Sequence, residues 1–380
     1  MALHISASAA AGLYQRSTIG LTDVLNVISK RSTPGDDPRD VDLANNAFFA
    51  LAIINIIIWV PVFLFLGYTL NTLLPALAVV EEDDAPPAYQ PVSLKDGNTD
   101  AKLGAIPSVD KSGRSQRGPV TAGVWATCRF LYSRGGVRSL FRGLGMAVVL
   151  NFARLFVSFL IFALLPVPPV TVAFIFVDLA IVQFSTLWLH TVISASSGSK
   201  SFWQRLPAFR AAFRATAIPT IAADLAVVLC DAVGKMMYGS MGILDVPNFM
   251  LFGSPTTTGA PRPSGSVVQA LSVIFVQLLL SLLITIPANV VLFRCQASLL
   301  PEDEDTIVPF DRTFQLESVR AKGQASMVEA FKSFSYAAWK RIVMLYAKVI
   351  AITIVSELAV VGLVFAQGLF VLSLLQKNGN

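Results

Sequence analysis

The chain has 380 residues, of which 54% are hydrophobic and only 14% are charged, with a formal net charge of +5. This balance excludes a soluble globular protein of this size and indicates a protein embedded in a lipid bilayer. The three cysteines, Cys128, Cys230 and Cys295, have no paired spacing, so neither a disulfide framework nor a zinc site is predicted. Nucleophile, phosphate-binding and dinucleotide-binding motifs are missing, so we expect no enzyme, no cofactor, no metal site and no nucleic-acid partner.

Six apolar segments are expected to cross the membrane as helices, because each is long enough for a hydrocarbon layer of about 30 Å. They are numbered here as the first to the sixth span and lie at residues 47–80, 144–165, 170–195, 216–238, 267–296 and about 342–375. The first contains Pro61 and Pro75 and is expected to be one long kinked helix. The second and third are separated only by residues 166–169 and must form a tight hairpin.

Polar segments divide the rest of the chain. Residues 81–123 form a Pro/Gly/Ser-rich linker whose composition cannot bury enough apolar surface to order itself. Lys and Arg concentrate in the loops after the first, third and fifth spans. These three loops are therefore expected to lie together on the side of the membrane from which they are not translocated. The expected organisation is a polar tail at 1–45, a first repeat at 46–166, a shortened second repeat at 167–240, a loop at 241–266, a third repeat at 267–375 and a tail at 376–380.

An aromatic residue followed by a base stands before each even-numbered span. Gly136 and Gly143 flank the first pair, and they are expected to end one short surface helix and to permit close approach of the next helix. A second surface helix is expected at 327–334. Such pairs also anchor unrelated membrane helices at the lipid interface. The three pairs are Phe141 and Arg142, Phe213 and Arg214, and Trp339 and Lys340.

The end of the fifth span, with Pro287, Asn289, Arg294 and Gln296, resembles the mitochondrial carrier family. In that family Pro-x-Asp/Glu-x-x-Lys/Arg-x-Arg-x-Gln closes each of three repeats. The resemblance implies an all-α integral membrane six-helix bundle with pseudo-threefold, carrier-like symmetry. It also implies transport of a small-molecule solute across a mitochondrial membrane.

The carrier motif is incomplete in this chain. Asn289 replaces its acid and Leu292 replaces its first base, while the equivalent positions after Pro75 hold Leu77 and Val80. In the family these acids and bases form a ring of salt bridges that closes the protein on the matrix side. We therefore expect closure here to rest on apolar packing and amide hydrogen bonds, and transport of standard carrier metabolites to be slow or absent.

Polar residues inside the apolar segments should face one another or a water-filled cavity, because burying them in lipid is costly. Arg154 and Asp224 lie at similar depths, so they are expected either to contact a solute or to form an interhelical ion pair that fixes packing. Because Arg154 and Asp224 carry opposite charges, they do not indicate whether the solute is an anion or a cation. The candidates for a solute cavity are Asn151, Arg154, Asp178, Asp224, Asp231, Lys235 and Glu357.

The linker contains Pro86, Pro87, Ala88 and Tyr89, which resemble the Pro-Pro-x-Tyr motif bound by WW domains. With residues 75–81, this stretch also resembles fungal membrane proteins labelled "ubiquitin carrier protein", although no ubiquitin-conjugating chemistry is implied. The alternative function is therefore a non-transporting membrane scaffold that recruits a WW-domain ubiquitin ligase. That scaffold would lie in an endomembrane, where the linker faces the cytosol.

A peptide covering residues 81–91 is expected to bind a WW domain of a membrane-associated ubiquitin ligase. The Tyr89→Ala peptide should lose most of this affinity, because the tyrosine fills the specificity groove. Calorimetric titration of both peptides measures the difference. Equal binding by the two would mean that the stretch is an ordinary linker.

Overall fold

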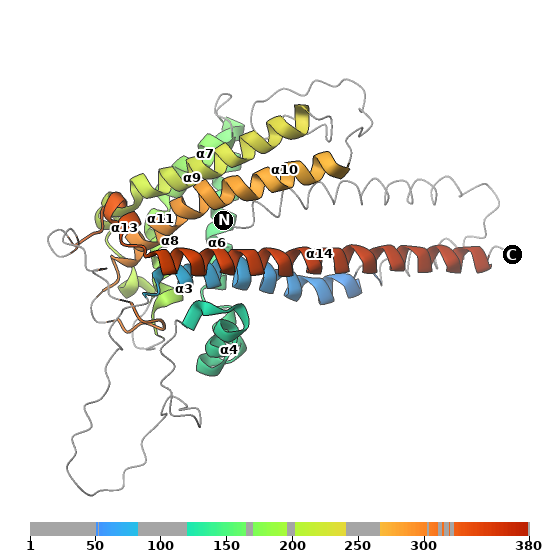
Figure 1. Ribbon diagram of the computed structural model, residues 1–380, viewed down its shortest axis with the longest axis horizontal. Helices are drawn as coiled ribbons and strands as arrows, with labels where there is room; N and C mark the ends of the chain where they lie inside the picture. The colour runs from blue at the N-terminus through green and yellow to red at the C-terminus, as the bar shows by residue number, and fades with distance from the viewer. Residues whose placement is uncertain are drawn as a thin grey trace, which may run out of the picture.

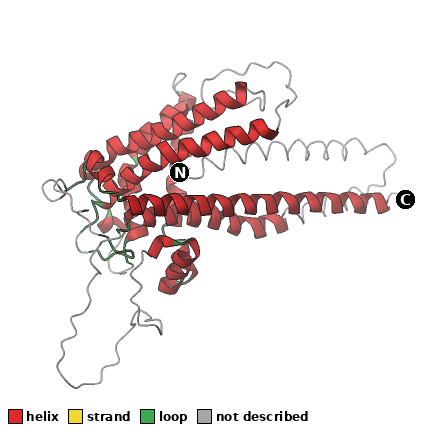
Figure 2. Ribbon diagram, in the orientation of Figure 1, coloured by secondary structure: helices red, strands yellow, loops and turns green. Residues whose placement is uncertain are grey.

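The computed structural model describes residues 51, 53–82, 120–164, 170–195, 202–240, 267–301, 304–310, 314, 319 and 323–378. These residues are almost entirely helical, and they contain no strand, only an isolated bridge between Ser194 and Thr306 (Figure 2). Five helices are long and apolar enough to cross a membrane, or six if one bent pair counts as a single span. The prediction of an all-α, multi-pass membrane protein is therefore confirmed, while the tail at 1–45 and the loop at 241–266 lie outside the described residues.

The first and fifth spans share an irregularity next to a proline. In the first, the π-helical stretch η1 (Phe65–Leu73) leads into α3 (Leu74–Val80); in the fifth, α10 (Val267–Leu280) and the π-helical η5 (Ser281–Thr285) lead into α11 (Ile286–Ala297). Pro75 and Pro287 occupy the first turns of α3 and α11. A proline inside a helix lacks an amide donor and clashes with the preceding turn, and a wider π turn relieves this clash. The first span is accordingly one continuous helix from Ile53 to Val80.

Two glycines shape the entry to the second span, as predicted. The helices here are α4 (Val124–Gly135), α5 (Val137–Leu140) and α6 (Leu144–Leu164), preceded by the short η2 (Val120–Ala122). Gly136 and Gly143 have φ angles of 62° and 74°, which favour glycine. A Cβ atom on Gly143 would lie 3.0 Å from the Tyr68 hydroxyl and 3.2 Å from the Trp188 indole nitrogen. The glycine therefore lets α6 start in contact with the first and third spans.

The third span differs from the prediction of one straight helix. It consists of α7 (Val170–Ala180) and α8 (Val182–Ile193), which are bent by 64° at Ile181. The fourth and sixth spans agree with the sequence, as does the short surface helix before the sixth. They are α9 (Phe209–Ser240), with Pro219 inside it, α14 (Tyr336–Asn378) and α13 (Met327–Lys332), while η3 (Phe202–Arg205) precedes α9.

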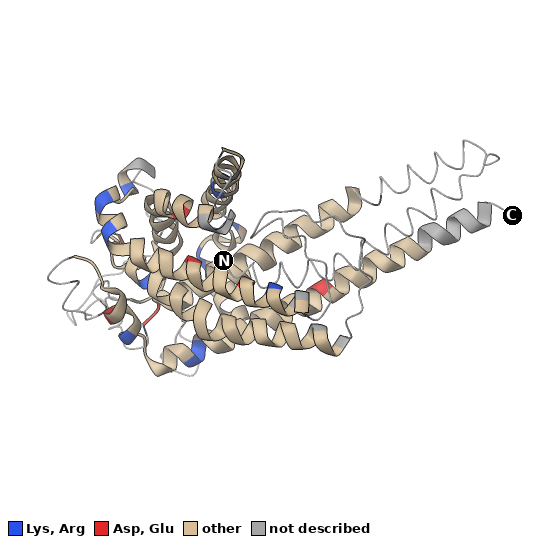
Figure 3. Ribbon diagram, turned by 90° about the horizontal axis from the view of Figure 1, so that it is seen from above, with Lys and Arg blue, Asp and Glu red and all other residues tan. Residues whose placement is uncertain are grey.

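The three odd-numbered spans converge at one end of the bundle. There α3, α8 and α11 contact one another, α14 lies along η1 and α3, and α9 packs against both halves of the third and fifth spans (Figure 1). This end also carries the loops after the odd spans and is called the loop end. Lys and Arg gather at the loop end, whereas the long helical arms are almost free of charge (Figure 3). The described residues thus keep the charge asymmetry that the sequence predicted.

The apolar core lies at the loop end as well. Leu73, Leu77, Leu189, Ile193 and Ile342 are fully or almost fully buried there. In contrast, α6 and α14 expose large apolar side chains along most of their length, which is the surface expected for helices in contact with lipid. Farther from the loop end, Asn55 of the first span and Gln367 of α14 exchange amide hydrogen bonds of 2.7 and 3.3 Å. Polar contacts of this kind hold membrane helices together where the hydrophobic effect does not.

The contact between α9 and α10 depends on Gly234. A Cβ atom at this position would lie 1.6 Å from Nε2 and 2.9 Å from Cδ of Gln277, whose amide donates to the Cys230 carbonyl at 3.1 Å. Gly234→Ala should therefore expel Gln277 and lower the free energy of unfolding by roughly 1–2 kcal/mol, measured by thermal unfolding in detergent.

Gly362→Ala in α14 is the matched control, because no atom lies within 4 Å of its added Cβ. This variant should keep or slightly raise the stability, since alanine favours a helix over glycine by about 1 kcal/mol. Identical unfolding midpoints for the two variants would contradict the packing role of Gly234.

Candidate functional site

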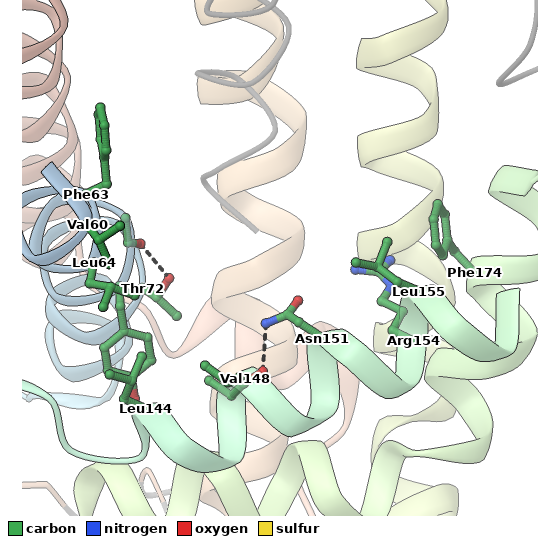
Figure 4. Close-up of a pocket in the computed structure, with 13 residues that line it drawn as sticks. Val60, Phe63, Leu64, Thr72, Leu144, Val148, Asn151, Arg154, Leu155 and Phe174 are labelled. Atoms are coloured by element: carbon green, nitrogen blue, oxygen red, sulfur yellow. Dashed lines mark hydrogen bonds between the residues drawn. The ribbon is translucent and has the colours of Figure 1, made fainter. Parts of the chain in front are cut away.

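Three charged side chains from different helices meet inside the membrane-spanning region. Arg154 of α6 places Nη2 2.7 Å from Oδ2 of Asp178 on α7 and 3.6 Å from Oδ1 of Asp224 on α9. The guanidinium also lies over the Phe174 ring, 4.8 Å from its centre (Figure 4). An ion pair between Arg154 and Asp224, one of the two alternatives that the sequence left open, is present, and Asp178 joins it. We call these three charged residues the mid-span cluster.

The two carboxylates of the mid-span cluster have unequal surroundings. Asp178 makes the short contact with Arg154 and is slightly exposed, whereas Asp224 is only 3% exposed. The hydrogen-bond contact of the Asp224 carboxyl is with the carboxyl of Asp178, and no N–H or hydroxyl donor among the described residues bonds its oxygens. A buried carboxylate is stable only when its charge is paired and its oxygens are satisfied. Asp224 is therefore the least satisfied member of the cluster.

An open groove of about 510 Å³ runs between the first span and α6 and reaches the mid-span cluster through Arg154. Its walls are mainly apolar, and Asn151 and Arg154 contribute polar groups from α6 (Figure 4). Asn151 donates to the Ala147 carbonyl at 2.8 Å and keeps its side-chain oxygen available. This volume is within the range of small-molecule pockets, which combine apolar walls with a few polar groups.

The remaining cavity candidates lie outside the mid-span cluster. Asp231 and Lys235 form their own pair on α9, at 3.9 Å and one helical turn apart. Glu357 is half-buried on α14 and makes no ion pair with any described residue. The structure thus brings together Asn151, Arg154, Asp178 and Asp224 and separates the other three.

A second group of charges lies at the loop end, and the sequence analysis named only Arg294 among them, as part of the carrier-like motif. Arg294 of α11 is 2% exposed, and its Nη2 lies 3.2 Å from Oε1 of Glu82, just after α3. Its guanidinium is also over the rings of Phe314 and Phe334, at 4.1 and 5.2 Å from their centres. Arg294 therefore joins the first and fifth spans through a desolvated ion pair supported by aromatic faces.

Glu81 is fully buried at the same place. Its carboxylate accepts hydrogen bonds from the Val120 amide at 2.5 Å, the Thr121 amide at 3.0 Å and the Thr121 hydroxyl. Arg341, at the start of α14, lies 3.9 Å from this carboxylate and donates to the Glu81 carbonyl at 2.8 Å. Glu81, Glu82, Arg294 and Arg341 are called the loop-end network.

The loop-end network corrects two expectations. Contacts resting on apolar packing and amide hydrogen bonds alone were expected there, but two ion pairs lie where the odd spans converge. The prediction that residues 81–123 do not order themselves is also wrong at both ends of this segment. Glu81 accepts hydrogen bonds from residues 120–121, and the Glu82 amide donates to the Pro309 carbonyl. Glu82 was missed because it stands five residues beyond the acid position of the motif, where the motif has an arginine.

A regular spacing in the sequence could have revealed the pair of Glu82 and Arg294. Glu82 follows Pro75 by seven residues, and Arg294 follows Pro287 by seven residues. Two positions at the same distance from these prolines thus carry opposite charges that contact each other.

The other residues of the carrier-like motif link α11 to its surroundings. Asn289 is buried and donates to the Thr285 carbonyl at 2.9 Å, one turn earlier in the same span. Gln296 donates to the Ser185 hydroxyl at 3.1 Å, and its carbonyl contacts His190 Nε2 at 2.9 Å. These bonds hold the third span against the fifth.

The three aromatic and basic pairs all lie where an even span begins, but their surroundings differ. Arg142 donates through Nε to the Thr191 carbonyl at 2.7 Å, and Phe141 packs against the core. Trp339 meets the edge of Phe334 at 4.9 Å between ring centres. Phe213, Arg214 and Lys340 are exposed. The WW-binding candidates Pro86, Pro87 and Tyr89 lie outside the described residues.

Comparisons of the chain with models of protein families, with curated proteins and with solved structures found no match. Function must therefore be argued from the chain's own geometry.

The loop-end pair can be measured with a double-mutant cycle on Glu82→Gln and Arg294→Gln. We expect a coupling free energy of roughly 1–3 kcal/mol, because Arg294 is buried and each single variant leaves a charge without its partner. Thermal unfolding of the four purified proteins in detergent gives the coupling.

The same cycle on Asp231→Asn and Lys235→Gln serves as the control. That pair is more exposed and lies within one helix, so its coupling should stay below about 1 kcal/mol. Equal coupling in the two cycles would show that the loop-end pair has no special role in joining the spans.

Proposed function

We propose that this protein is a diverged carrier-like membrane protein that binds a small polar solute at the mid-span cluster and moves it across the bilayer. The observation that supports this most directly is the placement of Arg154, Asp178 and Asp224 inside the membrane-spanning region, beside a groove. Charges at this depth are costly to keep, and in membrane proteins they mark solute and ion pathways. A purely structural contact would be served at lower cost by amides, as between Asn55 and Gln367.

Interrupted helices surround the cluster and support the same function. Asp178 lies close to the 64° bend at Ile181, and Asp224 follows Pro219 in α9. In many transporters the solute site is formed by discontinuous helices, because freed backbone groups and local bending create room for a ligand. The bend of the third span thus occurs near the charged side chains.

The loop end supports a carrier-like arrangement. Mutual contact of α3, α8 and α11 gives the three odd spans a common meeting point, and the equally spaced Glu82 and Arg294 pair there. In an alternating-access protein, such pairs hold one side closed and must separate when that side opens. The loop-end network is therefore the closing device of this proposal, with charges placed differently from those of the family motif.

The scaffold function remains an alternative because of Pro86, Pro87, Ala88 and Tyr89 in the linker. The two ends of the linker lie beside each other at the loop end, because the Val120 amide donates to the Glu81 carboxylate and the Glu82 amide donates to the Pro309 carbonyl. Imaging of a tagged protein against organelle markers separates the two functions: a mitochondrial inner membrane favours the carrier, and an endomembrane favours the scaffold.

Solute binding can be tested by thermal unfolding of the purified protein with a panel of amino acids, carboxylates, amines and nucleotides. One chemical class is expected to raise the unfolding midpoint by a few degrees, since a ligand that binds only the folded state stabilises it. Arg154→Gln should lose this shift.

Asp231→Asn is the control, because this residue is on α9 but outside the mid-span cluster. It should keep the shift. A panel without any effect on the wild type, or an equal shift in Arg154→Gln, would overturn solute binding at this cluster.

A further inference from the structure

The charges of the mid-span cluster do not balance. One guanidinium faces two carboxyl groups, and the same nitrogen of Arg154 contacts both. Arginine stays protonated in proteins, so the cluster carries one surplus negative charge whenever both acids are ionised. A surplus charge in a water-poor interior is costly, and a bound positive charge removes this cost.

Other charged groups near α9 do not supply the missing positive charge. Among the described residues, Arg154 and Asp178 are the charges that act on Asp224. Lys235 pairs with Asp231 on the same helix, α10 has no charged residue, and Arg294 on α11 pairs with Glu82. His190 on α8 contacts the Gln296 carbonyl at the loop end.

Asp224 is the place where a positive charge would bind. Asp178 already holds the short contact of 2.7 Å with Arg154, whereas Asp224 lies at 3.6 Å and is almost completely buried. The hydrogen-bond contact of Asp224 is with the Asp178 carboxyl, and two carboxyl groups share such a bond only when one of them holds a proton. Arg154 connects this position to the groove.

We propose that the Asp224 carboxyl binds one proton and exchanges it for a small monovalent cation, so that the solute of this protein is cationic. The inference rests on the proposed function and names the charge class of its solute. The exchange balances: the O–H bond of the Asp224 carboxylic acid breaks, the proton leaves to water, and the cation takes its place beside the carboxylate. The net charge of the cluster is zero before and after the exchange, so neither state carries an unpaired charge.

The bound proton can be detected by infrared spectroscopy of the purified protein at neutral pH, because a protonated carboxyl has its own C=O stretch. We expect this band in the wild type and its loss in Asp224→Asn. Asp178→Asn should lose it as well, since Asp224 then becomes the sole ionised partner of Arg154. Asp231→Asn should keep the band. All variants replace a carboxyl with an amide of the same size, and gel filtration checks that they fold.

The exchange is measured by adding sodium, potassium or ethylammonium chloride to weakly buffered protein and recording the released protons. One of these cations should release about one proton per wild-type protein and abolish the infrared band, as linkage between proton and cation binding requires. Choline chloride, whose cation is too large for a close contact with a buried carboxylate, controls for ionic strength. Asp224→Asn should release no proton with any of the salts.

A wild-type protein without the protonated carboxyl band, or with a band that persists in Asp224→Asn, would overturn the proposal. So would a band that none of the three cations removes, because the proton would then be a fixed part of the structure. These measurements do not use the solute panel, so a panel without effect and an Asp224 without a proton are separate results. Proton release only by an inorganic cation would identify the ion, and release only by ethylammonium would identify an organic amine as the solute class.

Discussion

The burial of the Glu81 carboxylate is the interaction on which the loop end of this protein depends. A buried carboxylate must receive hydrogen bonds and a counter-charge, and Glu81 receives them from residues 120–121 and from Arg341. The first span, the entry to the second and the start of the sixth are thereby tied to one group. Glu82 adds the fifth span through Arg294, so that four spans meet at two adjacent residues.

The type and approximate position of five membrane helices could be predicted from the sequence because lipid imposes a simple rule. Every backbone group in hydrocarbon must bond within its own helix, and apolar length alone then indicates a span. This rule held for α6, α9 and α14 and for the continuous first and fifth spans. It could not show the bend at Ile181, because residues 180–182 contain no proline, glycine or charge to mark it. The threefold arrangement of the spans stays a prediction.

The contact between Arg154 and Asp224 could be predicted from their depth in the spans, whereas the burial of Glu81 and Glu82 could not be predicted from composition. Counting residues from Arg142 and Arg214 placed Arg154 and Asp224 at one level, and the structure joins them. Glu81 and Glu82, however, begin a run of four acids before a proline-rich stretch, and such a run is usually solvated. Only the convergence of α3, α8 and α11 shows that the first two acids are enclosed. The seven-residue spacing of Glu82 from Pro75, which equals that of Arg294 from Pro287, was the signal in the sequence that distinguished Glu82.

The two charged groups of this protein differ in their balance, and this difference assigns them different roles. In the loop-end network two acids face two bases, and aromatic rings, backbone carbonyls and amides complete the contacts. Such a network requires no ligand. Under the proposed function, its ion pairs hold the odd spans together and break when these spans separate. In the mid-span cluster two acids face one base, and the acid farther from the base has its hydrogen-bond contact with the other acid. Under the proposed cation exchange, a bound positive charge balances this cluster, and its occupancy changes the electrostatic energy of the helices that form it. Both α7 and α9 contact α8 or α11, so a change of charge at Asp224 would act on helices that meet at the loop end. Under the proposed function, the unbalanced charges of the mid-span cluster respond to a cation, and the balanced charges of the loop-end network hold the bundle closed until they do.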